Sequence, residues 1–285
     1  MGIYPQPNIW QCGPFALKHA LVMLGIFADE KDITKIAGTH WWHGTDDLQL
    51  GRAAKHFRCD LKMIRRHDPE KARSELLSYL RRGIPSLLCV YNWSHWVTVV
   101  KAESGKFIIL DSKEKAVLTI LTWRELKSRW VYYETDVHDK SHRESLYDFH
   151  PVVPAFRIRT KAKFSLARAR YLRRHENRSL SRMWDVYIAD LLTICKPRTP
   201  LSEKVFSLGE FFRRHRSMIL DQVETWHGDI NRRSAMRILR NMLFVADTYG
   251  LVISESDEKR AIAGITAVLS LWAASTYGVH PVYPS

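Results

Sequence analysis

Apolar positions near the start of the chain recur with the spacing of a buried helix. Pro14 suits a first helical turn, because its missing N–H and fixed φ cost nothing there. Apolar residues dominate from Phe15 to Leu24, and Gly25 is a residue type that often follows a last helical turn. The pattern therefore predicts a helix that begins at Cys12 and stops at Gly25.

Between residues 30 and 135, helical and strand periods alternate along the chain. Helical spacing predicts short helices, and runs of β-branched and aromatic residues between turn residues predict strands. The expected helices cover 33–37, 46–56, 69–82 and 122–130, and the expected strands cover 59–64, 84–91, 95–100, 106–111, 116–121 and 131–133. Helices that precede an antiparallel sheet indicate the α+β class.

A polar stretch from residue 136 to residue 145 interrupts this pattern, and Pro151 and Pro154 follow it. Such a shift in composition is typical of a domain boundary. Beyond it the apolar spacing is helical, with helices expected over 164–175, 179–195, 200–227, 230–249 and 257–276. We therefore expect an α+β domain over 1–150 and an all-α, basic domain over 151–285.

Positive charge is concentrated in one part of the chain. The formal net charge is +14, and residues 156–240 hold 16 Arg and 4 Lys against 8 acidic residues. Arginine prefers planar anions such as carboxylate and phosphate. The region is expected to bind an acidic protein partner or nucleic acid, with a membrane partner not expected. The alternative is an ordinary solvated face of the helices.

The cysteines and the two ends of the chain bear on the compartment. Cys12, Cys59, Cys89 and Cys195 are widely spaced and contain no CxxC pair, and the N-terminus lacks the features of a signal peptide. These features predict a cytoplasmic protein without disulfides. The uncharged stretch 261–279 is long enough to raise the question of a tail anchor, but Gly, Ser and Thr dilute it, which favours a buried helix.

Candidate chemistry begins at Cys12. A thiol at a helix N-terminus faces unpaired backbone N–H groups and the positive end of the helix dipole, and both favour the nucleophilic thiolate. The same N–H groups can hold an oxyanion. Gln6, six residues upstream, can supply a side-chain amide to that oxyanion.

A base and a group that orients it are expected on a later hairpin. His95 opens one predicted strand, Asp111 closes the next, and a turn at 103–105 joins them. Adjacent antiparallel strands bring these two residues to the same end of the hairpin. Cys, His and Asp in this order form a papain-like arrangement for nucleophilic catalysis.

Each of these residues also has an ordinary structural reading. A cysteine at a helix start is often a small buried hydrophobe, and a histidine or an aspartate can simply open or end a strand. Four further residues have spacings that suggest zinc, namely His40, His43, His56 and Cys59, but they fit no standard ligand signature. A loop beside the cleft is favoured for them, with Trp41 and Trp42 shaping a groove or lid. No metal or cofactor is expected.

The ordered set of motifs resembles the C39 and C39-like cysteine peptidases over about the first half of the chain. The residues that carry this resemblance are Gln6, Cys12-Gly13-Pro14, Gly44-Thr45 with Leu48, Gly83-Ile84-Pro85, His95-Trp96-Val97 and Asp111. The resemblance implies a papain-like fold, with Cys12 as nucleophile, His95 as general base and acid, Asp111 as its orienter and Gln6 as oxyanion donor. Where the best-known members continue into ABC-transporter segments, this chain continues into a basic helical region.

Together these features predict a thiol hydrolase that cleaves a peptide or isopeptide bond in a protein or peptide substrate. An acyltransferase or deamidase with the same triad is the nearest alternative, because only the second nucleophile differs. The alternative from another class is a binding protein without enzymatic activity, whose basic helices recruit nucleic acid or an acidic partner.

Overall fold

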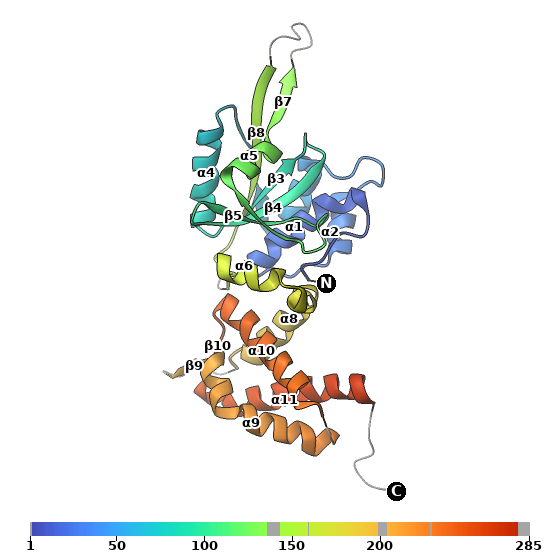
Figure 1. Ribbon diagram of the computed structural model, residues 1–285, viewed down its shortest axis with the longest axis vertical. Helices are drawn as coiled ribbons and strands as arrows, with labels where there is room; N and C mark the ends of the chain where they lie inside the picture. The colour runs from blue at the N-terminus through green and yellow to red at the C-terminus, as the bar shows by residue number, and fades with distance from the viewer. Residues whose placement is uncertain (1, 136–142, 159, 199–203, 229, 279–285) are drawn as a thin grey trace. The chain divides into compact units, whose positions relative to one another are not determined.

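The computed structural model describes residues 2–135, 143–158, 160–198, 204–228 and 230–278 (Figure 1). The chain divides into two compact units, Met1–Asp185 and Val186–Ser285. Each unit is described by itself below.

The first unit contains helices on both sides of a central sheet. It opens with a short 3-10 turn, η1 (Ile9–Gln11), that leads directly into α1 (Cys12–Met23). The other helices are α2 (Glu30–Ala37), α3 (Asp47–His56), α4 (Pro69–Arg81), α5 (Trp123–Trp130), α6 (Leu166–Arg173), the 3-10 turn η2 (His175–Asn177) and α7 (Arg178–Arg182).

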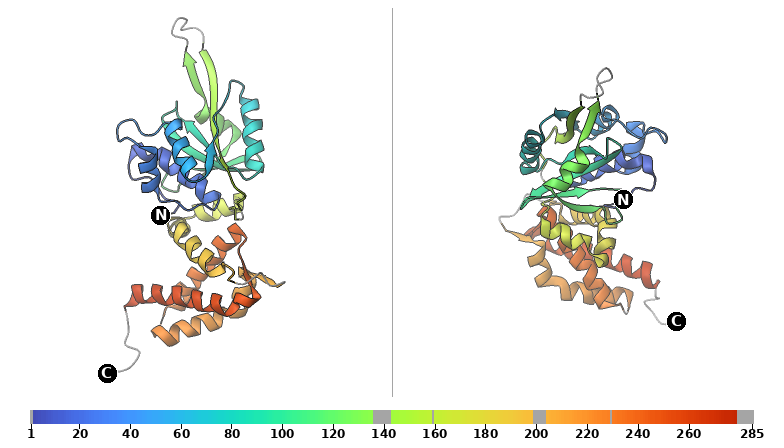
Figure 2. Two further views of the ribbon diagram at one scale, coloured as in Figure 1. Left: turned by 180° about the vertical axis from the view of Figure 1, so that it is seen from behind. Right: turned by 45° about the horizontal axis from the view of Figure 1, so that its top comes forward.

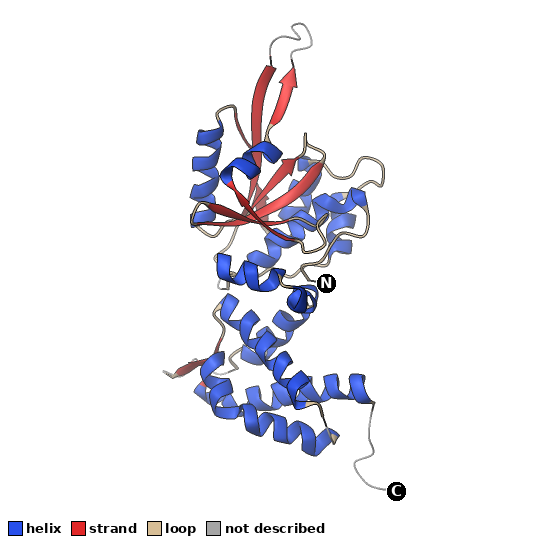
Figure 3. Ribbon diagram, in the orientation of Figure 1, coloured by secondary structure: helices blue, strands red, loops and turns tan. Residues whose placement is uncertain are grey.

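The sheet has eight strands, and every pairing within it is antiparallel. Its path runs β1-β8-β3-β4-β5-β6, and β2 and β7 also pair with β8. Figure 3 draws the strands in red and the helices in blue. The strands are β1 (Cys59–Leu61), β2 (Ile64–Arg66), β3 (Ser86–Val90), β4 (His95–Glu103), β5 (Lys106–Leu110), β6 (Leu118–Thr122), β7 (Tyr132–Thr135) and β8 (Arg143–Pro154). The strands β7 and β8 continue as a hairpin beyond the rest of the sheet (Figure 2).

Alternating side chains of the central strands build two cores on opposite faces of the sheet. Leu87 and Cys89 of β3 pack with residues of α1, α2 and α3. Leu88 and Val90 of the same strand pack with residues of α4 and α5. This period of two is what a strand buried on both faces requires, and it leaves α1 covered on all sides, with every one of its residues buried.

The second unit is helical apart from one short two-stranded ladder. Its helices are α8 (Trp184–Cys195), which begins at the last residues of the first unit, α9 (Leu208–His227), α10 (Arg232–Tyr249) and α11 (Glu258–Tyr277). The ladder pairs β9 (Val205–Ser207) with β10 (Val252–Ser254), and a 3-10 turn, η3 (Glu255–Asp257), follows it. Among the residues that the structure describes, no helix has the length and apolarity needed to cross a bilayer.

The predicted α+β class with a helical C-terminal part is confirmed. The first helix begins at Cys12, and Gly25 follows it with φ +78°. Its conformation and the space around it both require glycine, because a Cβ at this position would lie 2.2 Å from the carbonyl oxygen of Thr160. Thr122 caps α5 as part of a capping box with Glu125.

The domain boundary differs from the expected one. Residue 150 lies inside β8, between β1 or β2 on one side and β3 on the other, and the first unit continues to Asp185. The physical reason is a buried ion pair: Lys18 Nζ lies 2.8 Å from Glu30 and 3.4 Å from Asp185. The Gly2 N–H also donates to Asp185, at 2.6 Å. These contacts attach residues 181–185 to the N-terminal segment.

Candidate active site

Cys12 is the first residue of α1 and is 7% exposed. The side chain of the preceding residue, Gln11, makes no capping hydrogen bond to the helix. The helix start is crowded, since a Cβ at Gly13 would lie 3.0 Å from Cβ of Thr45. A side chain at position 13 would therefore push against the loop that carries Thr45.

His95 and Asp111 form a buried pair at one end of the β4–β5 hairpin. His95 opens β4, and Asp111 follows the last residue of β5. A two-residue turn at Ser104 and Gly105, both with positive φ, joins the strands as expected. Nε2 of His95 lies 2.6 Å from Oδ1 of Asp111, and both residues are at most 5% exposed.

The environment of His95 stabilises its protonated form. Burial lowers the pKa of this imidazole, but the hydrogen bonds and charges of Asp111 and Cys12 outweigh burial and raise the pKa to about 9. Because Nε2 is directed at Asp111, Nδ1 is the ring nitrogen left to face the thiol. The structure thus brings Cys12, His95 and Asp111 together from α1, β4 and the end of β5.

Gln6 lies close to this group, but its amide makes contacts within the chain. Its Nε2 donates to the carbonyl oxygens of Asn8 (2.9 Å) and Ile9 (3.2 Å). Its Oε1 accepts from the Ser112 hydroxyl at 2.5 Å, and its N–H donates to the Ser112 carbonyl at 2.9 Å. Gln6 is therefore bound to Ser112, the residue that follows Asp111. The sequence alone did not predict these hydrogen bonds.

A strained turn immediately precedes His95. Three successive non-glycine residues have left-handed φ values: Tyr91 (+55°), Asn92 (+60°) and Trp93 (+59°). Such residues cost roughly 1–2 kcal/mol each. Neighbours hold the turn, because Tyr91 donates its N–H to the Arg129 carbonyl at 2.8 Å and Trp93 stacks on Tyr132 with ring centroids 3.8 Å apart. The turn brings the ring of Tyr91 over His95, 6.4 Å between centroids.

The other three thiols lie in environments that suppress ionisation. Burial raises the pKa of Cys59 to about 11 and the pKa values of Cys89 and Cys195 to about 12. All four cysteines are free. At neutral pH, Cys59, Cys89 and Cys195 therefore remain protonated and weakly nucleophilic.

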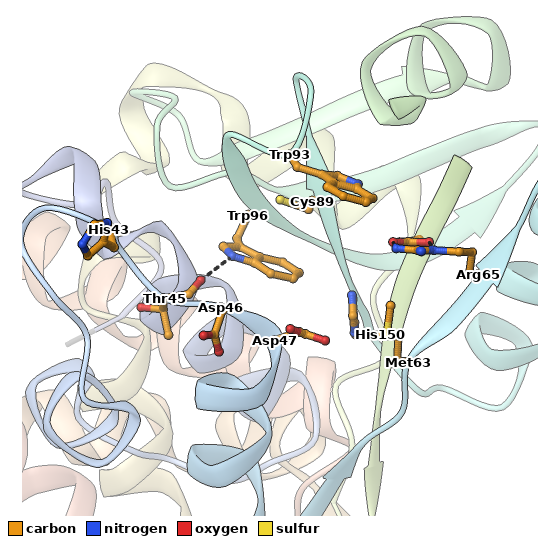
Figure 4. A pocket seen from close by; sticks show the side chains of 11 residues that line it. His43, Thr45, Asp46, Asp47, Met63, Arg65, Cys89, Trp93, Trp96 and His150 are labelled. Carbon is orange, nitrogen blue, oxygen red and sulfur yellow. Dashed lines mark hydrogen bonds and ion pairs between the residues drawn. The ribbon is translucent and has the colours of Figure 1, made fainter. Parts of the chain in front are cut away.

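A cavity of about 310 Å³ lies beside the candidate residues (Figure 4). Cys89 and Trp96 line it, and both pack in the same core cluster as Cys12. The indole N–H of Trp96 donates to the Thr45 carbonyl at 3.0 Å, which joins the cavity wall to the loop against Gly13. No sequence motif predicts this cavity, because its walls come from β2, β3, β4, β8, the start of α3 and the loop before it.

The residues considered for zinc are divided between different elements of the fold. His40 and His43 stack in the loop before α3, 5.4 Å between ring centroids, whereas Cys59 is buried in β1. Within the described ranges, no three His, Cys, Asp or Glu side chains are grouped as a metal site requires. Trp41 and Trp42 of the same loop are largely exposed.

Comparisons with known proteins give structural similarity alone. No profile of a known family matches the sequence, and no curated protein matches it. The peptidase domain of Streptococcus ComA, a bi-functional ABC transporter, matches over 54% of this chain and 98% of that domain, at 18% identity and a TM-score of 0.40. A double glycine motif protease from an AMS/PCAT transporter, in complex with the leader peptide, matches over 52% and 90%, at 17% identity and a TM-score of 0.38.

A C39-like peptidase from Bacillus anthracis is a further match, over 53% of this chain and 94% of that one, at 13% identity and a TM-score of 0.36. The resemblance to C39 peptidases that the motifs carry is thus matched by similarity to solved C39 peptidase domains over about half of the chain.

Proposed function

We propose that the first unit is a cysteine hydrolase that cleaves peptide or isopeptide bonds. The observation that carries this proposal is the buried 2.6 Å pair of His95 and Asp111, with the Cys12 thiol close enough to help raise the pKa of the same imidazole after Asp111. A thiol against a histidine that is itself oriented by a carboxylate is the arrangement required of an activated nucleophile.

In the proposed reaction the Cys12 sulfur attacks the substrate carbonyl carbon after its proton has passed to His95. The C–N bond breaks when the imidazolium of His95 gives that proton to the departing amine, which leaves a thioester on Cys12. A water molecule, deprotonated by His95, then attacks the thioester and restores the thiol. Asp111 keeps the ring oriented and stabilises its charge in both steps.

The oxyanion that forms in each step needs donors near the start of α1. Backbone N–H groups at this helix start are the first candidates. Gln6 serves as a further donor if one of its amide hydrogens leaves the carbonyl of Asn8 or Ile9. Its tie to Ser112 keeps the side chain beside Asp111 during such a change.

Acyl transfer or deamidation would use the same residues, since only the second nucleophile or the leaving group differs. A product analysis separates them: hydrolysis gives a free carboxylate and a free amine, transfer gives a new amide, and deamidation releases ammonia from an intact chain.

The test is an electrophilic probe. Limiting iodoacetamide, followed by mass spectrometry of the labelled peptides, should modify Cys12 before Cys59, Cys89 and Cys195, because burial keeps the last three protonated. His95→Ala should slow labelling of Cys12, whereas His175→Ala, an exposed histidine of η2, should not. Uniform labelling of all four thiols would remove the basis of the proposal.

We propose in addition that the first unit binds an anionic macromolecule through arginines of α6 and α7. Residues 156–185 hold ten basic and two acidic residues. Five exposed arginines there, namely Arg170, Arg173, Arg174, Arg178 and Arg182, have no ion pair within the described part of the chain. In the second unit, Arg213 and Arg214 pair with Glu210, and Arg232 pairs with Asp221 and Glu224. Exposed arginines without an ion pair in the described ranges are also found there, namely Arg216, Arg233, Arg237 and Arg240.

Replacing Arg173, Arg174 and Arg178 by Gln should therefore weaken binding to polyglutamate or to single-stranded nucleic acid, and raising the salt should reduce the difference. The matched control is the replacement of Arg213, Arg214 and Arg232, whose charges are already partnered. Equal losses in the two triple variants would show that general charge, and not this surface, is responsible.

A further inference from the structure

The cavity beside Cys12 carries an excess of negative charge in a chain of net charge +14. Its walls contain the carboxylates of Asp46, Asp47 and Asp148 and the guanidinium of Arg65. Asp148 and Arg65 neutralise each other through two hydrogen bonds, at 2.9 and 2.7 Å, between paired positions of β2 and β8. Asp46 caps α3, since its carboxylate accepts from the Gln49 N–H at 2.7 Å.

Asp47 is the third carboxylate of the cavity walls. Among the residues that the structure describes, it has no hydrogen bond or ion pair through its side chain. Its charge reaches across the cavity. It adds to the rise in the pKa of Arg65, caused first by the Asp148 hydrogen bond, and to the rise in the pKa of Cys89, caused first by burial, and it opposes the burial that lowers the pKa of His150. A partly exposed anion that faces several walls of one cavity is placed to attract a cation into it.

His150 is a second polar group in the same walls whose ring has no hydrogen-bond partner within the described part of the protein. It lies on β8, is 3% exposed, and its ring has no hydrogen-bond partner in the described ranges. Burial is the largest influence on its pKa and lowers it, so the ring is neutral at neutral pH and one nitrogen is an acceptor. Buried polar groups normally have partners, and an acceptor beside an unpaired carboxylate suits a ligand that donates hydrogen bonds.

The third feature is an aromatic wall. Trp96 lines the cavity, meets the ring of His150 edge to face at 5.2 Å between centroids, and is held by its hydrogen bond to Thr45 (Figure 4). The other indole, Trp93, already has Tyr132 on one side and the Arg65 guanidinium 5.3 Å from its ring. An indole beside a carboxylate is a favourable surface for the aliphatic stem and charged end of a lysine or arginine.

We propose that this cavity receives a lysine or arginine side chain of the substrate, close to the scissile bond, with Asp47, His150 and Trp96 as its contacts. The inference rests on the proposed peptidase function. The position follows from the shared wall: Trp96 is the residue after His95, and Cys89 lies close enough to Cys12 for the two sulfurs to interact electrostatically. The volume, about 310 Å³, is at the small end of ligand pockets, about 300 Å³, and suits one long side chain.

An acidic or an apolar side chain fits these walls less well. A carboxylate would meet Asp47 with only the already paired Arg65 to receive it. An apolar side chain of lysine's length would leave Asp47 and His150 without partners. A site built for hydrogen bonding rejects a ligand that leaves its buried polar groups unpaired.

The experiment uses tetrapeptide acyloxymethyl ketones with lysine, norleucine or glutamate at one position and alanine elsewhere. Their second-order rate constants for labelling Cys12 are compared in the wild type, Asp47→Asn and Asp32→Asn, the last an exposed carboxylate of α2 away from the cavity. At one position lysine should react about tenfold faster than norleucine, the ratio typical of one good charged contact. Asp47→Asn should remove this ratio, and Asp32→Asn should keep it.

Two results would overturn the inference while leaving the peptidase proposal intact. One is labelling by norleucine as fast as by lysine at every position, and the other is a lysine preference that survives Asp47→Asn. In the reverse direction, Asp47→Lys should favour the glutamate ketone.

If no ketone labels Cys12, the peptidase proposal fails, and binding is measured directly. The indole N–H resonance of Trp96 should then shift with the lysine tetrapeptide amide in Cys12→Ala, and should not shift when Asp47→Asn is added. No shift in Cys12→Ala would overturn the cavity assignment as well.

Discussion

Helix α1 contributes to two buried polar clusters that differ in their surroundings. At its first residue, Cys12 meets His95 and Asp111 beside a cavity. Six residues further on, Lys18 is fully buried between Glu30 and Asp185, with the ring of Tyr4 4.6 Å away. In the second cluster the lysine has its counter-charges within the chain, whereas the first cluster lies next to space that a ligand can fill. Burial of charge is therefore poor evidence for function without such space.

The largest expected effect separates the two clusters by activity. Cys12→Ala and His95→Ala should each reduce peptide turnover by about 10³-fold or more, Asp111→Asn should reduce it less, and the double variant Cys12→Ala/His95→Ala should match the worse single variant, because these residues act as a unit. Thermal unfolding should show that all variants remain folded. If the double variant is far slower than either single one, the residues act independently and the triad assignment is wrong.

Lys18→Met should affect stability. It leaves the carboxylates of Glu30 and Asp185 facing each other without their cation, and breaking a buried pair in this way costs about 3–5 kcal/mol. Urea unfolding measures the loss, and the control is Lys31→Met, which removes an exposed ammonium of α2. A loss below about 1 kcal/mol, the size seen for surface pairs, would mean that water reaches the Lys18 cluster.

The two clusters should also fail at opposite ends of the pH range. The folded-state pKa of His95 is raised to about 9, so its contribution to stability is complete below its unfolded pKa, about 6.5, and is lost as the pH rises through 9. Burial opposes ionisation of Glu30, but hydrogen bonds from Lys18 and Tyr4 lower its pKa to about 2, so its contribution is present above about 4.5 and is lost as the pH falls through 2.

Urea unfolding from pH 2 to pH 10 tests this difference. His95→Gln should flatten the alkaline slope and leave the acid one, and Glu30→Gln should do the reverse. An alkaline slope that persists in His95→Gln would assign it to other groups.

The smallest expected effect concerns the strained turn before His95. Asn92→Ala should destabilise the first unit by about 1 kcal/mol, because alanine tolerates a φ of +60° less well than asparagine, and Asn92→Gly should be neutral within about 0.5 kcal/mol. Equilibrium unfolding in urea measures both. Equal stability of the alanine and glycine variants would mean that the turn relaxes and stores no strain.

The parts of this fold that the sequence predicted are those set by local signals. The start of α1, the β4–β5 hairpin and the cap at Thr122 follow from proline, glycine and capping residues and from alternating apolar positions. The strand β8 was not predicted, because Asp148, His150 and Pro151 interrupt its apolar residues. All three nevertheless lie in the middle of the sheet. A polar residue that pairs with a distant strand cannot be distinguished from a linker residue by composition.

The candidate site divides in the same way. Cys12, His95 and Asp111 could be predicted as candidates from their order in the sequence and their places on the predicted helix and strands. The hydrogen bonds of the Gln6 amide to Asn8 and Ile9 could not, because they depend on the path of a short loop. The cavity walls are not predictable from the sequence, since Arg65 and His150 are brought together by the sheet and Asp47 comes from the start of α3. Charge counting also located the arginines only coarsely, because it cannot tell a partnered guanidinium from an unpartnered one.

The pairing of Lys18 with Asp185 has a consequence for how the protein is made. The candidate nucleophile is synthesised before most of the unit around it. The sheet beneath it lacks a central strand until residue 154 exists, and the buried lysine of its helix lacks one partner until residue 185 exists. At about 5–20 residues per second, synthesis from Cys12 to Asp185 takes roughly 9 to 35 seconds. A nascent chain would hold Cys12 in an unfinished unit for that time, and the proposed chemistry at Cys12 would have to wait for the last segment of the unit to emerge.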